Sequence, residues 1–587
     1  MFSLRRLSDW AFLLESAILA ISLSACSSPA GNSGPGRALS SIAVTPPTAS
    51  INVGAMQQFN AKGTYSDGST QDITTTAQWA SLDTTVATIQ SNSGLATGAA
   101  IGTAQITASL SGVVSPPASL SVTTSGASTP ALVQHVSSSN TRSNNFSSPF
   151  CYHFQLPNPT TAGNAVVVGF TFNGNPSPTV TDDGNDVYAV EANHFDSADT
   201  QSVGIAAAFN VAAGARTIKL CFSADPGGFV QPMATEFSNV TGIDGGGAGA
   251  DGSGTSAAAG SMTPSLAGDL VYQVVSSFTT LPSQSSFSAG VQPNINWGLL
   301  SADLMDGFAG QYGVYNSTAT INPTIAMGTS QKWVTAAVLL KAGPAGGVPT
   351  GMRIVHLMHE NIPSSLGGGG SGNPFPSTIP LQLASSGNLL VAMIGGGNPS
   401  NTVSSITDTK TNTWTQAGVP QVIANNDTVQ AFFAANATSS PDLALTLNWS
   451  SNGGGDFTIF FYDVAGAATS PLDSGSVVGT TGTQPALGDL TLPFSVTPAS
   501  ANEIIFVQTI WDANTGVGLT GAGQFFDANW FDGESLGGPE PVDENNGWGH
   551  VPTTNTTPVT FTWIPKDLTQ QPFGNWAAMA LAFKAGP

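Results

Sequence analysis

The feature of this sequence that most constrains its fold is a long internal duplication. Six short blocks recur in the same order in two stretches of the chain, residues 131–343 and 353–586. A Gly-Asn pair before an apolar run, for example, stands at 163–164 in the first stretch and at 387–388 in the second. Two copies of one sequence are expected to adopt one fold twice. The spacing between matching blocks grows from 224 to 243 residues, so the second copy carries insertions, which we expect in loops.

The composition of the 587-residue chain favours short β-strands over helices. Only 8% of its residues are charged, so the Glu, Lys and Arg that stabilise long helices are scarce, whereas Gly (67) and Pro (38) are abundant. Each copy holds about eight strand-like runs, enough for a two-sheet sandwich with a sizeable core. We therefore predict one jelly-roll-like β-sandwich per copy. A Gly-Asp pair before another apolar run, at 268–269, leaves two immunoglobulin-like units per copy as the alternative.

The ends of each copy predict how the two copies are connected. The last strand of a copy is expected to pair beside its first strand, which holds Leu132-Val133 in one copy and Ile354-Val355 in the other. That pairing would bring the two ends of a copy together. The segment Pro344–Pro349 would then link two separate sandwiches.

A shorter module precedes the copies, at residues 39–124. Its strand-like runs recur about every 8 to 12 residues with turn residues between them, the pattern of a small antiparallel sandwich. The stretches IAVTP, VGAMQQFNAKGTYSDGST, W-x-S at Trp79, VATI and GLATGAAIGTAQITA resemble the bacterial immunoglobulin-like group 2 domain. The resemblance implies a spacer or interaction module with no shared catalytic residues. We expect Phe59 and Trp79 to anchor its core, and Gly94 and Gly102 to occupy turns or close approaches.

The N-terminus predicts that the protein is exported. Arg5 and Arg6 precede an apolar run from Ala11 to Leu23, interrupted by Glu15 and serines. A run of this length is typical of a signal peptide and too short for a good membrane span.

The end of that run predicts a lipid anchor. The tetrapeptide Leu23-Ser24-Ala25-Cys26 resembles the lipobox of a bacterial lipoprotein. The resemblance implies that residues 1–25 are removed as a signal peptide and that Cys26 is acylated, which would make a membrane the partner of the N-terminus. It also implies that Ser27 sorts the protein to the outer membrane or cell surface. The Gly- and Ser-rich residues 26–38 are typical of a flexible tether.

Two further cysteines, Cys151 and Cys221, lie in strand-like runs of the first copy. An exported protein permits a disulfide between them. The alternative is a pair of buried free thiols. Two thiols without a neighbouring cluster of histidines do not suit zinc, so we predict no metal site here.

Charge and motifs argue against a nucleic-acid partner and against catalysis. The net charge is −22, from 13 basic and 35 acidic residues, which leaves too few cations for a basic face. The run His356-Leu357-Met358-His359-Glu360 has the wrong order for a zinc-protease helix. We therefore predict that the protein is not an enzyme and carries no resident cofactor.

One acidic turn of the first copy suits calcium weakly. Asp182, Asp183 and Asp186 offer hard oxygen ligands at near-alternate positions, but the closing Glu of a full calcium loop is missing. The matching turn of the second copy, Asp408–Asn412, keeps only one carboxylate. The alternative is a turn held by Asx hydrogen bonds.

One insertion of the second copy, residues 524–550, is the strongest candidate ligand site. It combines carboxylates with aromatic rings, and the residues that we single out are Trp530, Phe531, Asp532, Glu534 and Trp548. Exposed rings can stack on the apolar faces of sugars while carboxylates accept hydrogen bonds from hydroxyl groups. A carboxylate pair could also cleave a glycosidic bond if held at the right separation. The alternative is a solvated loop with its rings packed inward.

These observations together predict an exported, lipid-anchored, all-β protein with an immunoglobulin-like spacer and two homologous sandwiches. Its expected role is non-enzymatic: adhesion, or the binding of a polysaccharide or surface protein. One alternative is an extracellular carbohydrate-active enzyme that uses carboxylates of residues 524–550. A second alternative is a purely structural surface protein.

Overall fold

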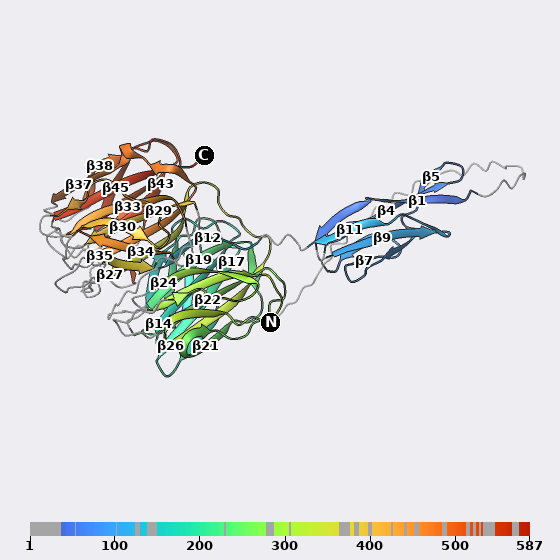
Figure 1. The fold of residues 1–587 in the computed structure, drawn as a ribbon, viewed down its shortest axis with the longest axis horizontal. Helices are drawn as coiled ribbons and strands as arrows, with labels where there is room; N and C mark the ends of the chain where they lie inside the picture. Colours follow the sequence, from blue (N-terminus) through green and yellow to red (C-terminus); the bar gives the residue numbers. More distant parts are fainter. Residues whose placement is uncertain are drawn as a thin grey trace, which may run out of the picture. The chain divides into compact units, whose positions relative to one another are not determined.

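The computed structural model describes residues 37–587 apart from short gaps at 53–54, 101, 124–128, 138–149, 228–229, 278–286, 304–306, 363–375, 381–386, 397–401, 424–426, 439–442, 451–456, 484–489, 512–516, 521–523, 528–529, 532–545 and 566–574. The described residues form strands β1 to β45 and one 3-10 turn, Ser474–Ser476, and they contain no α-helix, which confirms the predicted all-β class. In this described part no helix has the length and apolarity needed to cross a membrane. The chain divides into two compact units, Met1–Gly126 and Ala127–Pro587 (Figure 1).

The first unit is a small sandwich of three sheets. Their strands are β1 (Leu39–Thr45), β4 (Asn60–Tyr65) and β5 (Thr70–Asp72) in one sheet; β10 (Val113–Val114), β9 (Gly102–Leu110), β11 (Ala118–Thr123), β2 (Thr48–Asn52) and β6 (Gln78–Ser81) in the second; and β3 (Met56–Gln58), β8 (Leu95–Gly98) and β7 (Ala87–Ile89) in the third. Apolar residues alternate with polar ones along β9, as expected for a sheet with one buried and one solvated face.

The core of this unit confirms the residues that the sequence singled out. Phe59 is fully buried and Trp79 is 4% exposed, and the indole N–H of Trp79 donates to the carbonyl oxygen of Thr74 at 2.8 Å. Gly94 has a φ of +71°, and a Cβ there would lie 2.4 Å from the Phe59 carbonyl oxygen. Gly102 also has a positive φ and lies against Val86. Only glycine fits such positions without strain.

The second unit is built around one sheet of eleven strands that runs through both copies. Its order is β16-β17-β14-β19-β12-β27-β35-β29-β33-β31, with β32 beside β33. The first copy supplies β12 (Ala131–Ser137), β14 (Ala165–Asn173), β16 (Ala189–Asp196), β17 (Gln201–Phe209) and β19 (Val230–Ser238). The second supplies β27 (Arg353–Ile362), β29 (Asn388–Gly396), β31 (Trp414–Gln416), β32 (Gln421–Val422), β33 (Thr428–Ala437) and β35 (Phe457–Ala465).

A small sheet covers each half of this shared sheet. The first copy contributes β15 (Pro178–Asp182), β18 (Thr217–Phe222) and β13 (Cys151–Gln155), and the second contributes β28 (Pro376–Pro380), β34 (Ala444–Trp449) and β30 (Val403–Asp408). The strand orders of the two copies match, both here and in the shared sheet. The duplication seen in the sequence is therefore a duplication of fold.

Larger sheets complete each copy. In the first copy they comprise β20 (Val240–Ile243), β21 (Ala248–Ala258), β22 (Asp269–Ser277), β23 (Phe287–Ser288), β24 (Ile295–Asp303), β25 (Phe308–Tyr315) and β26 (Thr324–Ala342). In the second they comprise β36 (Ala467–Leu472), β37 (Val478–Thr483), β39 (Ile504–Trp511), β41 (Phe525–Phe526), β43 (Asn546–Pro552) and β45 (Asn575–Ala585), with β38 (Leu490–Val496), β40 (Val517–Thr520) and β44 (Val559–Pro565) as a further sheet. Each copy is thus at least three layers deep, and neither copy is a simple two-sheet sandwich.

The two copies meet where β12 pairs with β27 in parallel, a contact that we call the seam. His135, Val136 and Ser137 lie opposite His356, Leu357 and Met358 there. When two parallel strands are related by a two-fold axis along the strands, equivalent residues of the two copies point to opposite sides of the sheet. Accordingly, β14 of the first copy packs its Val166 and Val168 on the side of the sheet where β29 of the second copy packs Leu389 and Val391.

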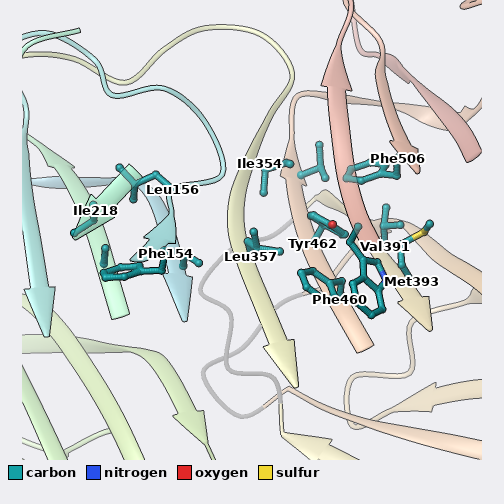
Figure 2. Close-up of a cluster of buried hydrophobic side chains, with 14 of the residues drawn as sticks. Phe154, Leu156, Ile218, Ile354, Leu357, Val391, Met393, Phe460, Tyr462 and Phe506 are labelled. Carbon is teal, nitrogen blue, oxygen red and sulfur yellow. The ribbon is translucent and has the colours of Figure 1, made fainter. Parts of the chain in front are cut away.

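Because the two copies are turned over relative to each other, buried apolar side chains from both copies pack together in one hydrophobic cluster. On one side of the shared sheet, the small sheet of the first copy lies next to the large sheet of the second copy. Figure 2 shows members of this cluster from both copies, including Phe154 and Ile218 from the first and Phe460 and Phe506 from the second, with Leu357 of the seam drawn between them.

Two expectations about the copies are therefore wrong. The last strands, β26 and β45, pair with β22 and β39 rather than with the first strands β12 and β27. The copies are also not separate sandwiches joined by a linker. The reason is that both edges of each first strand are occupied, one by a strand of its own copy and the other by the first strand of the other copy.

Candidate functional site

The insertion at residues 524–550 is a structural bridge between the two copies. Its β41 pairs with β43 of the second copy, and its β42 (Trp530–Phe531) pairs with β13 of the first copy. Tyr152 and His153 lie opposite Phe531 and Trp530 in that pairing. We call β41 and β42 the strap. A segment that the sequence suggested as a ligand loop therefore adds a fourth strand to a sheet of the other copy.

A buried polar cluster, which we call the clamp, is centred on Asp527, which lies between β41 and β42 in sequence. Its other members are Arg216, Tyr462 and His550. Asp527 is 2% exposed, and its Oδ1 accepts a hydrogen bond from the Arg216 guanidinium of the first copy at 2.7 Å. Its Oδ2 lies 2.8 Å from Nδ1 of His550 and accepts a hydrogen bond from the Tyr462 hydroxyl at 3.0 Å. The Arg216 guanidinium also lies over the ring of Phe525, 4.6 Å from its centroid. One carboxylate thus joins β35 and β43 of the second copy to the first copy.

Burial sets the electrostatics of the clamp. Desolvation lowers the pKa of Arg216, and the neighbouring Asp527 carboxylate opposes that shift. Burial and the same carboxylate hold the pKa of Tyr462 well above its usual value, so this hydroxyl stays a hydrogen-bond donor. An ion pair in such surroundings contributes little by itself, but removing one partner leaves an uncompensated buried charge. The clamp therefore connects the two copies through specific polar contacts, and its four side chains are buried.

The position of Trp548 corrects the proposed sugar-binding set. Its ring is 4% exposed and stacks on Phe460 with centroids 4.3 Å apart and planes 18° apart. The ring of His359 also stacks on Phe460, with centroids 4.4 Å apart. Burial lowers the pKa of His359 to about 4. Trp548 is a core residue, so the expectation of an exposed ring is wrong for it. For Trp530 and Phe531 only the backbone pairing is described, and Asp532 and Glu534 lie outside the described residues.

The acidic turn of the first copy is organised by internal hydrogen bonds. Asp182 accepts from the backbone N–H of Asp186 at 2.9 Å and from the hydroxyl of Tyr188 at 3.1 Å. Asp183 accepts from the backbone N–H groups of Arg216 and Thr217. This is the Asx-turn arrangement that was the alternative to a calcium loop. Within the described ranges, no three His, Cys, Asp or Glu side chains come together as a metal site.

The matching turn of the second copy shows how one carboxylate can be replaced. Asn412 donates from its side chain to Asp408 at 2.9 Å and accepts from the backbone N–H of Thr438 at 2.7 Å. Asp186 accepts the equivalent backbone hydrogen bond, from Ala212, but its other oxygen is buried and has no hydrogen-bond partner. Burial, together with the Asp186 charge, raises the pKa of Asp182. The first copy thus holds two facing acids where the second holds an acid and an amide.

A second repeated polar device was missed in the sequence. Glu236 of β19 accepts hydrogen bonds from the side chains of Gln134 and Asn164, and burial raises its pKa. At the matching position of the second copy, Asp463 accepts from Asn388 at 2.7 Å. The Gly-Asn pairs that mark the duplication were the signal: their asparagines bind a buried acid on the neighbouring strand of the shared sheet, β19 beside β14 in the first copy and β35 beside β29 in the second. In each copy, therefore, one buried carboxylate accepts a hydrogen bond from the asparagine of the Gly-Asn pair.

The two cysteines of the first copy lie opposite each other on β13 and β18 and are joined by a disulfide. The bond ties together the sheet whose outer edge receives the strap. Cys26 lies outside the described residues.

Comparison with known proteins identifies the first unit. Residues 38–122 match the family model of the bacterial Ig-like domain (group 2). This part of the chain is a bacterial Ig-like domain. No family model matches the two copies that follow it.

A protein from Shewanella frigidimarina (strain NCIMB 400), named Ice-binding protein 1, is 60% identical to this chain over 72 residues. The match covers 12% of this chain and 8% of that protein, so the chain spans less than a tenth of the relative's length.

The described residues of the Ig-like domain form a core and turns, and no three His, Cys, Asp or Glu side chains among them come together as a metal site. Its acids Asp67 and Asp72 are exposed and Asp83 is half-buried, and each accepts hydrogen bonds from a Ser or Thr two residues further on. Those hydrogen bonds lower the pKa of each carboxyl. They are local turn contacts, which agrees with a spacer or interaction module.

We predict that the clamp is essential for the stability of the double-copy unit. Arg216→Met leaves Asp527 buried without its cation and should lower the free energy of unfolding by about 3–5 kcal/mol. The matched control is Lys332→Met, which removes a surface ion pair to Asp199 and should cost less than about 1 kcal/mol. Denaturant unfolding of the full chain measures both. The clamp's role would be refuted by an equal, small effect of the two variants.

We also predict that Asp186→Asn stabilises the first copy at neutral pH. The pKa of Asp182 is higher in the folded state than in the unfolded state. Protonation of Asp182 therefore stabilises the folded state at low pH, and this stabilisation is lost as the pH rises through the folded-state pKa. Removing the second charge should gain on the order of 1 kcal/mol at pH 7, a figure that allows for solvent screening at this half-buried site. The gain should shrink towards pH 4.

The mirror variant in the second copy, Asn412→Asp, provides the control. It introduces the facing acids that Asp186→Asn removes, so it should destabilise at pH 7 and do so less in acid. Thermal unfolding at a series of pH values measures both changes. Shifts of the same sign, or shifts independent of pH, would contradict the explanation.

Proposed function

We propose that this protein is an exported surface protein whose double-copy unit binds a polysaccharide or a surface protein without catalysis, with the Ig-like domain as spacer. The observation that carries the proposal is the Ig-like domain at residues 38–122 attached to a large, fused all-β unit. The relative from Shewanella frigidimarina is named for binding ice, which agrees with a binding role. The matched share is too small to make ice the ligand of this chain.

The polar groups of the described core favour binding over catalysis. Asp527, Glu236 and Asp463 are each engaged by side chains that fasten one strand to another. None of them is paired with a second carboxylate across a cleft, which the carbohydrate-active alternative requires. Among the insertion's other acids, Asp532 and Glu534 are the two through which we propose that a sugar is bound.

A structural role is the second candidate, and a specific observation favours it. The strap pairs with the first copy, and Trp548, one of the rings that the sequence suggested for sugar binding, is buried and stacks on Phe460. A surface protein of this kind would need the insertion only to hold its two copies together.

A glycan array should separate these roles. We expect the full chain with Cys26→Ser to bind one or more neutral or basic polysaccharides, and Asp532→Asn/Glu534→Gln to weaken that binding at least tenfold. The matched control is Asp67→Asn, which removes an exposed carboxylate from a turn of the Ig-like domain. Binding that survives the double variant would place the site elsewhere. If no glycan and no bacterial surface retains the unaltered protein, the structural role replaces the binding role.

Fractionation of cells tests the anchor independently. We expect the chain to appear in the outer-membrane fraction and to incorporate labelled fatty acid, because several acyl chains on one residue give stable membrane binding. Cys26→Ala should abolish the label and release the protein or leave its signal peptide uncut. A Cys151→Ala/Cys221→Ala chain serves as the control for loss of thiols. Labelling that persists without Cys26 would exclude the lipobox assignment.

A further inference from the structure

Four buried polar residues form a row across the seam. They are Thr235 on β19, His135 on β12, His356 on β27 and Asp463 on β35, with exposed fractions of 0%, 1%, 2% and 0%. Successive residues of the row lie opposite each other on neighbouring strands, so their side chains share one face of the shared sheet. The centre of the row, where the two copies meet, is a pair of histidines from different copies.

Both histidine rings are held from their outer sides. Nδ1 of His135 lies 2.8 Å from the Thr235 hydroxyl, and Nδ1 of His356 lies 3.2 Å from Oδ2 of Asp463. In the tautomer in which Nδ1–H donates to Thr235 or to Asp463, the lone pair of each imidazole is on Nε2. Neither Nε2 atom has a hydrogen-bond partner, although both are buried. The ring centroids are 5.7 Å apart, with the planes at 62°.

A soft ligand lies one pleat further along the same face. Met358 follows His356 by two residues, so its side chain points to the same side of the sheet, and it is 7% exposed. The seam register places it opposite Ser137, two pairs along from the histidines. A methionine side chain is long and flexible enough to reach back towards its neighbour two residues away.

We propose that the seam binds one Cu(I) ion through Nε2 of His135, Nε2 of His356 and the thioether of Met358. Imidazole and thioether ligands together select a soft cation such as Cu(I) over Mg²⁺ or Ca²⁺. The outer contacts of the two rings are those that orient histidine ligands in metal sites: a carboxylate or hydroxyl on Nδ1 fixes the tautomer and leaves Nε2 for the metal.

The separation of the rings is compatible with a shared ion. At a metal–nitrogen distance of about 2.0–2.1 Å, an ion lies about 3.2 Å from each ring centroid. Two centroids 5.7 Å apart then subtend an angle of about 125–130° at the ion. That value lies between the trigonal and linear arrangements of an ion with few ligands. The thioether is outside the His, Cys, Asp and Glu set, which forms no group of three in the described part of the chain.

The inference is independent of the proposed polysaccharide or adhesion role. Its site contains residues of both copies, so a bound ion would cross-link the copies at the contact that joins their sheets. His194 provides an internal contrast, because its Nε2 is already 2.8 Å from Oδ1 of Asp251 and both side chains are partly exposed. A surface histidine of that kind should not retain an ion.

The test uses Ag(I), a redox-inert stand-in for Cu(I), on the full chain with Cys26→Ser so that no free thiol competes. Protein refolded or incubated with Ag(I) is titrated by calorimetry, and the bound metal is counted by mass spectrometry. We expect one Ag(I) per chain and a higher unfolding midpoint in its presence, because a ligand that binds only the folded state stabilises it.

Variants assign the ligands. His135→Gln should abolish tight binding, Met358→Leu should weaken it by at least about tenfold, and the control His194→Gln should leave it unchanged. Met358→Leu nearly conserves volume, so it keeps the proposal testable if His135→Gln fails to fold. The site is refuted if the unaltered chain takes up no Ag(I), or if all three variants bind equally. Zn²⁺ bound as tightly as Ag(I) and unaffected by Met358→Leu would overturn the thioether assignment.

Discussion

The parallel pairing of β12 with β27 is the contact on which the architecture of residues 127–587 depends. Among the described residues three pairs form it, and it turns two sheets into one. Because the paired strands run in the same direction, the two copies are turned over relative to each other. The small sheet of one copy therefore lies beside the large sheet of the other, and a single hydrophobic cluster extends through both.

Polar residues specify this arrangement where apolar packing alone would not. A Leu or Val at the joint would pack against many partners, whereas a buried carboxylate accepts only neighbours that satisfy it. Asp527 requires Arg216 from the other copy, and Glu236 and Asp463 each require an asparagine from their own copy. The apolar cores supply most of the stability, and these few carboxylates fix which strands meet.

Local patterns were sufficient to predict much of the fold but little of the contact between copies. The all-β class, the Ig-like domain with Phe59 and Trp79 in its core, and the duplication all follow from short-range alternation, turn residues and repeated blocks. The seam, the strap and the clamp depend on pairs such as Arg216 and Asp527, which are 311 residues apart. Single buried charges leave no periodic signature, and an edge strand looks the same in sequence whether it is open or paired. The burial of Trp548 was missed for a related reason, since aromatic rings near carboxylates occur both in sugar sites and in packed cores.

The geometry of the seam also bears on how such a chain arose. Two equivalent strands paired around a two-fold axis form an isologous contact, the kind that joins identical subunits of a homodimer. A single ancestral copy could have used the edge of β12 to dimerise, and duplication then placed both subunits on one polypeptide. Fusion frees the halves to differ. The strap is present on one side, where it covers β13, while the matching strand β28 begins and ends in Pro376 and Pro380, residues that lack the N–H needed to accept a further strand. Symmetry-breaking of this kind, unavailable to a true homodimer, lets one half of the molecule specialise while the other preserves the shared sheet.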